Sequence, residues 1–220
     1  MKKMILAGTA LTALAGCATQ GAEPVMLATP VTASTVPVAA VQAPVPDNIL
    51  LAQWTGPYAG VPPWDQVRPD LFPQALQYGI DELLREAMAV ANNPAQPTFE
   101  NTIEAMERSG QRLDRVLSIF SVMTSNTTTP EYQALDKEWS PKITAAYDEI
   151  TLNPQLFQRI KTLYDNNASL GLEADQDRLL TRTYDSFVRR GANLNAEQKQ
   201  QLSQYNQELA ELFATFSERV

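Results

Sequence analysis

A helical repeat of apolar residues between Thr98 and Thr124 is the feature that most constrains the fold of this chain. Apolar side chains there recur at steps of three and four residues, which places them along one face of an α-helix. They are Phe99, Ile103, Met106, Leu113, Leu117 and Phe120, with Gly110 on the same line. The spacing predicts one amphipathic helix of about 25 residues. Because glycine on a buried face favours close approach of another helix, we expect a packing partner at Gly110.

The opposite face of this segment carries charges of both signs, at Glu100, Glu104, Glu107, Arg108, Arg112, Asp114 and Arg115. Glu104 and Arg108 stand four residues apart, which is the spacing of an ion pair along one helix. Two carboxylates on one face are also what a catalytic acid–base pair requires. The mixture of signs favours a solvated surface over such a catalytic pair.

The chain after position 70 repeats the helical pattern almost without a break. Apolar stripes bounded by recognisable start or stop residues cover 72–92, 130–150, 154–166, 174–190 and 195–220. Short Pro-containing links such as 94–97 place successive helices antiparallel. No stretch alternates apolar and polar residues as a strand does. The sequence therefore predicts an all-α fold built from antiparallel helical hairpins.

The stretch from Leu50 to Pro73 is different, because it is rich in Trp, Tyr, Gly and Pro. Its Gly-Pro and Pro-Pro pairs predict extended loop. We expect its apolar side chains to pack as a belt across the helices, and stacking on a carbohydrate or peptide is the alternative. These side chains are Trp54, Tyr58, Val61 and Trp64.

Composition argues against several classes of function. The 220 residues carry a formal net charge of −8, which argues against binding to nucleic acid by charge. The chain has no histidine and a single cysteine, so it lacks the commonest zinc ligand, the usual general base and any internal disulfide. Gly-rich phosphate loops and nucleophile elbows are also missing. We therefore assign no catalytic and no metal-binding residue within these 220 residues.

The N-terminus has the features of a bacterial lipoprotein leader. Two lysines precede an apolar run that is too short for a transmembrane helix. Leu14-Ala15-Gly16-Cys17 then resembles the lipobox, in which the chain is cut before a cysteine that is lipidated. We predict a signal peptide at 1–16 and a lipid anchor on Cys17, in preference to an ordinary leader with a chance cysteine. Ala18 favours the outer membrane of the cell envelope, with the protein facing the periplasm.

Residues 17–47 are rich in Ala, Val, Thr and Pro and carry little charge. Prolines at such intervals block helix and sheet, so we predict a disordered tether that reaches at most ~90 Å at roughly 3 Å per residue. The helical region 48–220 follows. Its apolar stripe stays in phase to Val220 without a stop signal, so we expect the region to be incomplete.

Several short motifs lie in this helical region. The most specific is Pro97-Thr98-Phe99-Glu100-Asn101-Thr102-Ile103, and the others are Trp54 to Tyr58, Gly60 to Trp64, Asn93-Pro94, Leu152 to Pro154, Phe187 to Gly191 and Phe216-Ser217. Together they resemble the N-terminal region of the thimet-oligopeptidase family, and most closely its bacterial peptidyl-dipeptidase (dipeptidyl carboxypeptidase) branch.

The resemblance implies a zinc metallopeptidase that hydrolyses short peptides and, in that branch, releases C-terminal dipeptides. The family holds zinc with a His-Glu-x-x-His helix and a later Glu, and a chain without histidine offers no position that matches this motif. The resemblance also implies that 48–220 forms part of the N-terminal lobe of a two-lobed helical enzyme, expected to be a monomer. The 220 residues alone are then expected to bind no zinc and to be inactive.

The alternative function is a non-catalytic helical envelope lipoprotein that serves as a binding or scaffold module. The two hypotheses differ at the last predicted helix. A complete scaffold needs buried partners for its apolar stripe, whereas part of a larger enzyme leaves that stripe exposed. The residues that decide this are Leu209, Leu212, Phe213 and Phe216.

Overall fold

A computed structural model of the chain describes residues 44–57, 60–127 and 129–217, all within one compact unit, Gln42–Val220. These residues are helical, as predicted, and their only β-type pairing is a single bridge between Thr55 and Val61. The α-helices are α1 (Phe72–Ala91), α2 (Ala105–Glu107), α3 (Gln111–Asn126), α4 (Pro130–Thr151), α5 (Pro154–Asp165), α6 (Ala174–Arg189) and α7 (Ala196–Ser217). None of the helices in the described ranges is long and apolar enough to cross a membrane.

Short turns of other helix types connect these elements. The 3₁₀ turns are η1 (Ile49–Leu51), η2 (Trp64–Gln66), η3 (Pro69–Leu71) and η5 (Asn167–Ser169), and η4 (Phe99–Glu104) is a π-helix. Proline or an Asn side chain marks several helix starts. Pro130 and Pro154 begin α4 and α5, and the Asn195 side chain accepts a hydrogen bond from the backbone N–H of Gln198, 2.9 Å away, at the start of α7.

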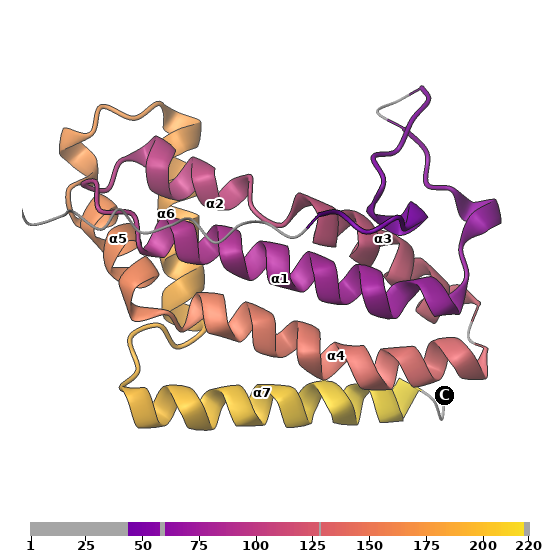
Figure 1. Cartoon of the computed structure of the whole chain (residues 1–220). Coiled ribbons are helices and arrows are strands. Elements are labelled where there is room, and N and C mark those ends of the chain that lie inside the picture. Colours follow the sequence, from indigo (N-terminus) through magenta and orange to yellow (C-terminus); the bar gives the residue numbers. More distant parts are fainter. Residues whose placement is uncertain (1–43, 58–59, 128, 218–220) are drawn as a thin grey trace, which may run out of the picture. The chain divides into compact units, whose positions relative to one another are not determined.

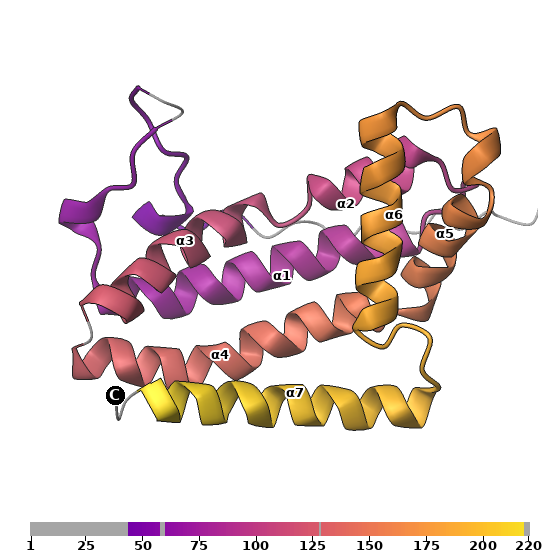
Figure 2. The ribbon, with the colours of Figure 1, turned by 180° about the vertical axis from the view of Figure 1, so that it is seen from behind.

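The helices α3, α1, α4 and α7 lie side by side in this order, with α5 and α6 packed together at one end (Figure 1). Figure 2 shows the same order from behind. Following the chain colours, α1 and α3 run antiparallel, and so do α4 and α7. The predicted antiparallel hairpins are therefore confirmed.

The core lies where α1, α3 and α4 meet. Phe72 at the start of α1 is fully buried, and its ring lies 5.2 Å from that of Phe120 on α3 and 5.9 Å from that of Tyr132 on α4. Ring pairs at this separation add to the free energy gained by burying their apolar area. This cluster fixes one end of the three helices against each other.

The single helix predicted over Thr98–Thr124 is wrong, because the chain breaks at Gly110. This glycine has a left-handed φ of 77° and separates the turns η4 and α2 from α3. Its backbone N–H donates to Glu86 Oε2 at 2.8 Å, and an added Cβ would lie 2.8 Å from Leu83 Cδ1. The predicted close approach of α1 at Gly110 is thus confirmed, but the backbone conformation also requires glycine here.

The predicted aromatic belt is only partly correct. Trp54 packs against the core, whereas Val61 and Trp64 are 52% and 44% exposed. Leu50 and Leu51 in η1 are buried instead, together with Phe72 at the end of this stretch. The 3₁₀ turns η1, η2 and η3 also replace part of the predicted extended loop, while Tyr58 lies outside the described residues.

Helix α7 packs on α4 with its less apolar face. Ala214 is buried there, the Asn206 side chain donates to both carboxylate oxygens of Asp148 at 3.1 Å, and Lys199 Nζ donates to the carbonyl oxygen of Leu152 at 3.1 Å. Burial lowers the pKa of Lys199. The apolar stripe of α7 consequently faces away from α4 and stays exposed.

Candidate functional site

A buried arginine holds the segment that carries the most specific sequence motif. Arg159 on α5 is 7% exposed. Its Nη1 donates to the carbonyl oxygens of Asn93 (2.8 Å) and Ala95 (2.9 Å), and its Nη2 donates to Asn101 Oδ1 (2.8 Å) and Thr102 Oγ1 (3.2 Å). None of these four acceptors is a carboxylate, and burial lowers the pKa of Arg159. We call Arg159 with these four residues the Arg159 joint.

The polar residues of the motif are occupied by local hydrogen bonds. Thr98 and Asn101 form a reciprocal cap, in which the Asn101 N–H donates to Thr98 Oγ1 (3.1 Å) and the Thr98 N–H donates to Asn101 Oδ1 (2.9 Å). Asn101 Nδ2 also donates to the carbonyl oxygen of Gln96 at 2.9 Å. Hydrogen bonds from its own backbone N–H and from Thr98 lower the pKa of Glu100. The motif therefore shapes the start of η4.

The predicted solvated face is correct in part. Glu104 and Arg108 form the expected exposed ion pair at 2.6 Å. Arg112, predicted to be solvated, instead donates through Nη1 to Glu82 Oε1 on α1, where the Glu82 side chain is only 5% exposed. Burial raises the pKa of Asp114 and nearby Arg115 partly offsets this. A pattern on one helix cannot reveal the Glu82 contact, because that residue lies on another helix.

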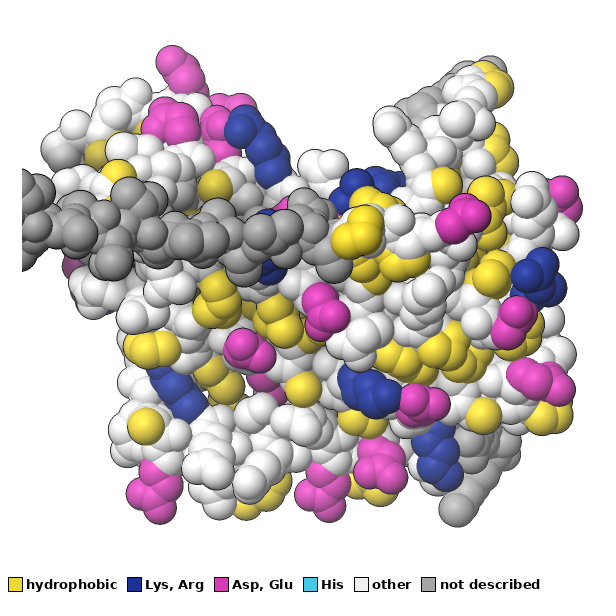
Figure 3. Space-filling view, in the orientation of Figure 1, with side chains coloured by type: hydrophobic (Ala, Val, Ile, Leu, Met, Phe, Trp, Pro, Cys, Tyr) yellow, Lys and Arg dark blue, Asp and Glu magenta, His cyan; other side chains and the backbone are white. Residues whose placement is uncertain are grey.

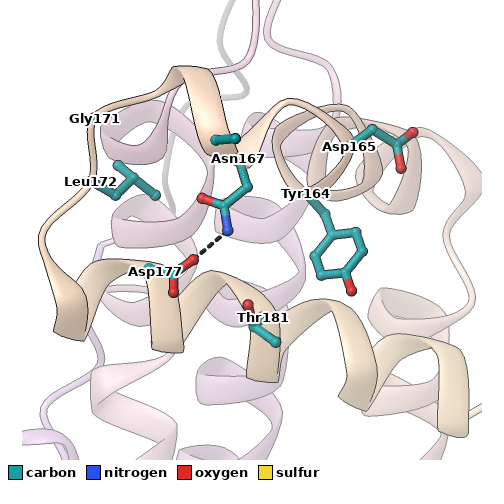
Figure 4. Close-up of a pocket in the computed structure, with 8 residues that line it drawn as sticks. Tyr164, Asp165, Asn167, Gly171, Leu172, Asp177 and Thr181 are labelled. Carbon is teal, nitrogen blue, oxygen red and sulfur yellow. Dashed lines mark hydrogen bonds between the residues drawn. The ribbon is translucent and has the colours of Figure 1, made fainter.

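The first polar recess lies between the end of α5 and the start of α6, with a volume of about 650 Å³. Figure 4 shows Asn167 reaching across it, and its Nδ2 donates to Asp177 Oδ1. Asp165 accepts from Lys161 Nζ at 2.5 Å, and the Tyr164 ring stacks on a ring of α6 with centroids 3.9 Å apart. Both carboxylates in the recess thus have partners, and its chemistry suits hydrogen bonding to a polar group.

A second recess, of about 560 Å³, lies between α4, α7 and the end of α6. Tyr147, Arg189 and Arg190 line it together with the hydrogen-bonded pair Asp148 and Asn206. Burial raises the pKa of Tyr147, Asp114 adds to this effect, and Arg190 opposes it. The phenol therefore stays protonated at neutral pH and is available as a hydrogen-bond donor.

Metal ligands do not gather in the part of the chain that the structure describes, where no three His, Cys, Asp or Glu side chains come together. The predicted lipidation residue Cys17, the signal peptide 1–16 and the tether up to residue 43 lie outside the described residues. Sequence reasoning missed Arg159 as the residue that organises the motif. Its only signal was a charged side chain among the apolar positions of 154–166.

No family model matches the chain. It is 36% identical over 173 residues to dipeptidyl carboxypeptidase of Escherichia coli strain K12, and equally to dipeptidyl carboxypeptidase of Salmonella typhimurium strain LT2. The match covers 79% of this chain but 25% of each relative, so the chain spans about a quarter of their length. Only 47 residues (220 − 173) remain outside the match. The matched stretch of 173 residues therefore includes positions 48–173 wherever it begins. The Arg159 joint thus lies in a region that is similar to one quarter of two bacterial peptidases.

Proposed function

We propose that the helical region 48–220 is the N-terminal part of a zinc-dependent metallopeptidase of the thimet-oligopeptidase type that releases C-terminal dipeptides from short peptides. The observation that carries this proposal is the 36% identity to two dipeptidyl carboxypeptidases over a region that includes the Arg159 joint. The exposed stripe on α7 supports it further, because a complete scaffold module is expected to bury such a stripe.

The residues of this chain do not fit the zinc site of such an enzyme. The 220 residues contain no histidine, and the described acidic side chains form no cluster of three. We therefore assign zinc and the catalytic groups to the part of the peptidase that lies outside the matched quarter. The contribution of this region is architectural, since rigid helices can restrict access to short, unfolded peptides.

The proposal extends to location. A lipid on Cys17 would tether the enzyme to the bacterial envelope, with the outer membrane favoured and the folded part facing the periplasm. Its partners would then be short peptides and the membrane, with no nucleic acid, and the enzyme would be a monomer. Metabolic labelling with a radioactive fatty acid tests the anchor, because label should enter the wild-type chain and be lost in Cys17→Ser.

A chimera tests the peptidase proposal. Residues 48–220 replace the matched quarter of the E. coli dipeptidyl carboxypeptidase, and release of a C-terminal dipeptide from a short peptide is measured with and without a zinc chelator. We expect the chimera to release dipeptides until zinc is removed, and the 220-residue chain alone to release none. A folded but inactive chimera, or stoichiometric zinc in the purified chain alone, would contradict the proposal and favour the scaffold alternative.

A further inference from the structure

One face of α7 is apolar and exposed along most of the helix. Its side chains are spaced at three, four or seven residues, so they form a continuous stripe, which we call the α7 stripe. Its members are Tyr205, Leu209, Leu212, Phe213 and Phe216, with exposed fractions of 58%, 51%, 58%, 63% and 65%. Five large apolar residues this exposed on one helix are unusual for a surface that faces only water.

The orientation of α7 leaves most of this stripe uncovered by the other described helices. Small and polar groups fix the opposite face on α4, through buried Ala214 and the hydrogen bonds of Asn206 and Lys199. Rotating the helix to bury the stripe on α4 would break these hydrogen bonds and place Asn206 in water. The stripe is therefore a surface that the contacts of this region hold outward.

A cavity of about 470 Å³ borders the stripe at Phe213. Its apolar lining comes from three helices, with Leu117 and Phe120 on α3, Ile143 on α4, and Phe213 and Ala214 on α7. Ala210, several Ser and Thr hydroxyls and one carboxylate line the remainder. The stripe and cavity together can receive the side chains of a helix laid along α7.

The charge on α7 beside the stripe is acidic. Glu208 is exposed about 40° from Leu212, at 100° per residue, and no Lys or Arg occurs between residues 200 and 217. Figure 3 shows acidic side chains along the edge of the molecule where α7 lies, with basic side chains toward the two ends of that edge. A complementary partner therefore carries an apolar stripe flanked by Lys or Arg.

We infer that the α7 stripe is the docking surface for an amphipathic helix whose apolar face is flanked by Lys or Arg. This helix belongs to the three quarters of the peptidase that this chain does not match, whether that part is the same polypeptide or a separate one. The inference rests on the proposed function and on the 25% coverage of the relatives. A second copy of the chain fits less well, because it would bring more acidic groups to an acidic edge. An anionic bilayer repels the same edge.

Cysteine accessibility measures whether the stripe is covered. Leu212→Cys lies in the stripe, whereas Gln204→Cys is exposed on the same helix about 80° from Leu212 and farther from the other members of the stripe, at 100° per residue. Both are made in a Cys17→Ser background. The rate of maleimide labelling at each position is followed by mass spectrometry in the 220-residue chain and in the E. coli chimera. We expect labelling at 212 to fall at least about tenfold in the chimera and labelling at 204 to change less than about twofold.

Equal labelling at 212 in the chain and in a folded chimera overturns the inference. If the cysteine at position 212 is protected from labelling in the chain alone, and more so at higher protein concentration, the occupant is a second copy and the inference is overturned. If protection requires added phosphatidylglycerol vesicles, the occupant is a lipid surface and the inference is also overturned. If the chimera does not fold, the E. coli remainder is added as a separate chain, and failure to protect 212 there also overturns it. Dipeptide release by the same chimera is read separately. A chimera that releases no dipeptide but protects the cysteine at position 212 from labelling contradicts only the proposed function.

Discussion

Arg159 illustrates how one buried charge can organise a link between helices. The guanidinium donates hydrogen bonds to four acceptors on the segment from the end of α1 into η4. Two of these acceptors are the backbone carbonyl oxygens of Asn93 and Ala95. The guanidinium is buried, so its N–H groups would lack partners without these acceptors, and the arginine and the link depend on each other. Lysine offers a single point of charge and cannot reproduce the planar fork of donors.

Replacing Arg159 should therefore destabilise the region strongly. We expect Arg159→Ala to lower the free energy of unfolding by about 3 kcal/mol or more, and Arg159→Lys to recover only part of this. Urea denaturation followed by circular dichroism measures both. Arg182→Ala, at an exposed position of α6, is the matched control and should cost less than about 0.5 kcal/mol. Equal losses for the two alanine variants would contradict the role given to the joint.

Gly110 gives a second test at the residue scale. Gly110→Ala meets a left-handed φ of 77° and a close contact with Leu83, whereas Gly171→Ala meets a similar φ of 65° with open space around the new Cβ. The backbone cost of about 1–2 kcal/mol is common to both. We expect Gly110→Ala to lower the melting temperature clearly more than Gly171→Ala does. Equal shifts would show that the Leu83 side chain can move away from the new Cβ without loss of stability.

At the scale of elements, α7 differs from the other helices. In α1 the predicted apolar face is the buried face, whereas in α7 the apolar stripe points outward and hydrogen bonds hold the opposite face. A hydrophobic pattern identifies the apolar face of a helix but not whether that face meets its own chain. The prediction of a helix beginning at 195 was therefore correct, and Asn195 and Gln198 cap it reciprocally, while the position of its stripe had to come from the structure.

Two aspartate variants on α7 should separate its faces. In the 220-residue chain, Leu212→Asp should change the free energy of unfolding by less than about 0.7 kcal/mol, because Leu212 is 58% exposed. Ala214→Asp places a carboxylate against α4 at a residue that is only 6% exposed, and it should cost about 2–4 kcal/mol. Chemical denaturation of both variants measures the difference. A larger loss for Leu212→Asp would mean that α7 docks with the opposite face.

The start of η4 should respond to acid. Hydrogen bonds to its own backbone N–H and to Thr98 lower the pKa of Glu100 from 4.5, so the folded state prefers the ionised carboxylate. Its contribution to stability is then fully present above pH 4.5 and is lost as the pH falls through the lower folded pKa. We expect Glu100→Gln to be less stable than wild type at pH 7 and to approach wild type at pH 2.5. A gap of unchanged size across this range would contradict the assignment.

At the scale of the whole molecule, periodicity and start or stop residues were enough to predict most helices and the antiparallel pairing of successive ones. The pairing of α4 with α7, which α5 and α6 separate in the chain, was not predicted. These patterns also did not predict the break at Gly110 or the contact between Glu82 and Arg112, because both depend on a second helix. Nor could they predict the polar recess at Tyr164 and Asp177, which forms where a loop and two helices meet. The resemblance to a peptidase family came from a motif whose residues are occupied in holding the Arg159 joint.

Metal removal should leave this region unchanged. Its 220 residues contain no histidine, and its described acidic side chains do not cluster, so no part of its stability is expected to depend on zinc. The melting temperature of the chain should shift by less than about 1 °C when EDTA is added, measured by differential scanning fluorimetry with a calcium chelator as the parallel control. A drop of several degrees on zinc removal would reveal a site made from residues outside the described ranges.

The neutral acceptors of Arg159 also determine which contacts survive in acid or at high salt. Hydrogen bonds that depend on an ionised carboxylate weaken when that carboxylate is protonated, and exposed ion pairs are screened by salt. Carbonyl, amide and hydroxyl oxygens do not titrate in this range, so the guanidinium keeps its four partners. Acid removes the contribution of Glu100 at the start of η4, but the hydrogen bonds of Arg159 should still join α5 to the link at 93–102. Their amide protons would then exchange last, leaving a residual folded segment that comprises the motif and its arginine.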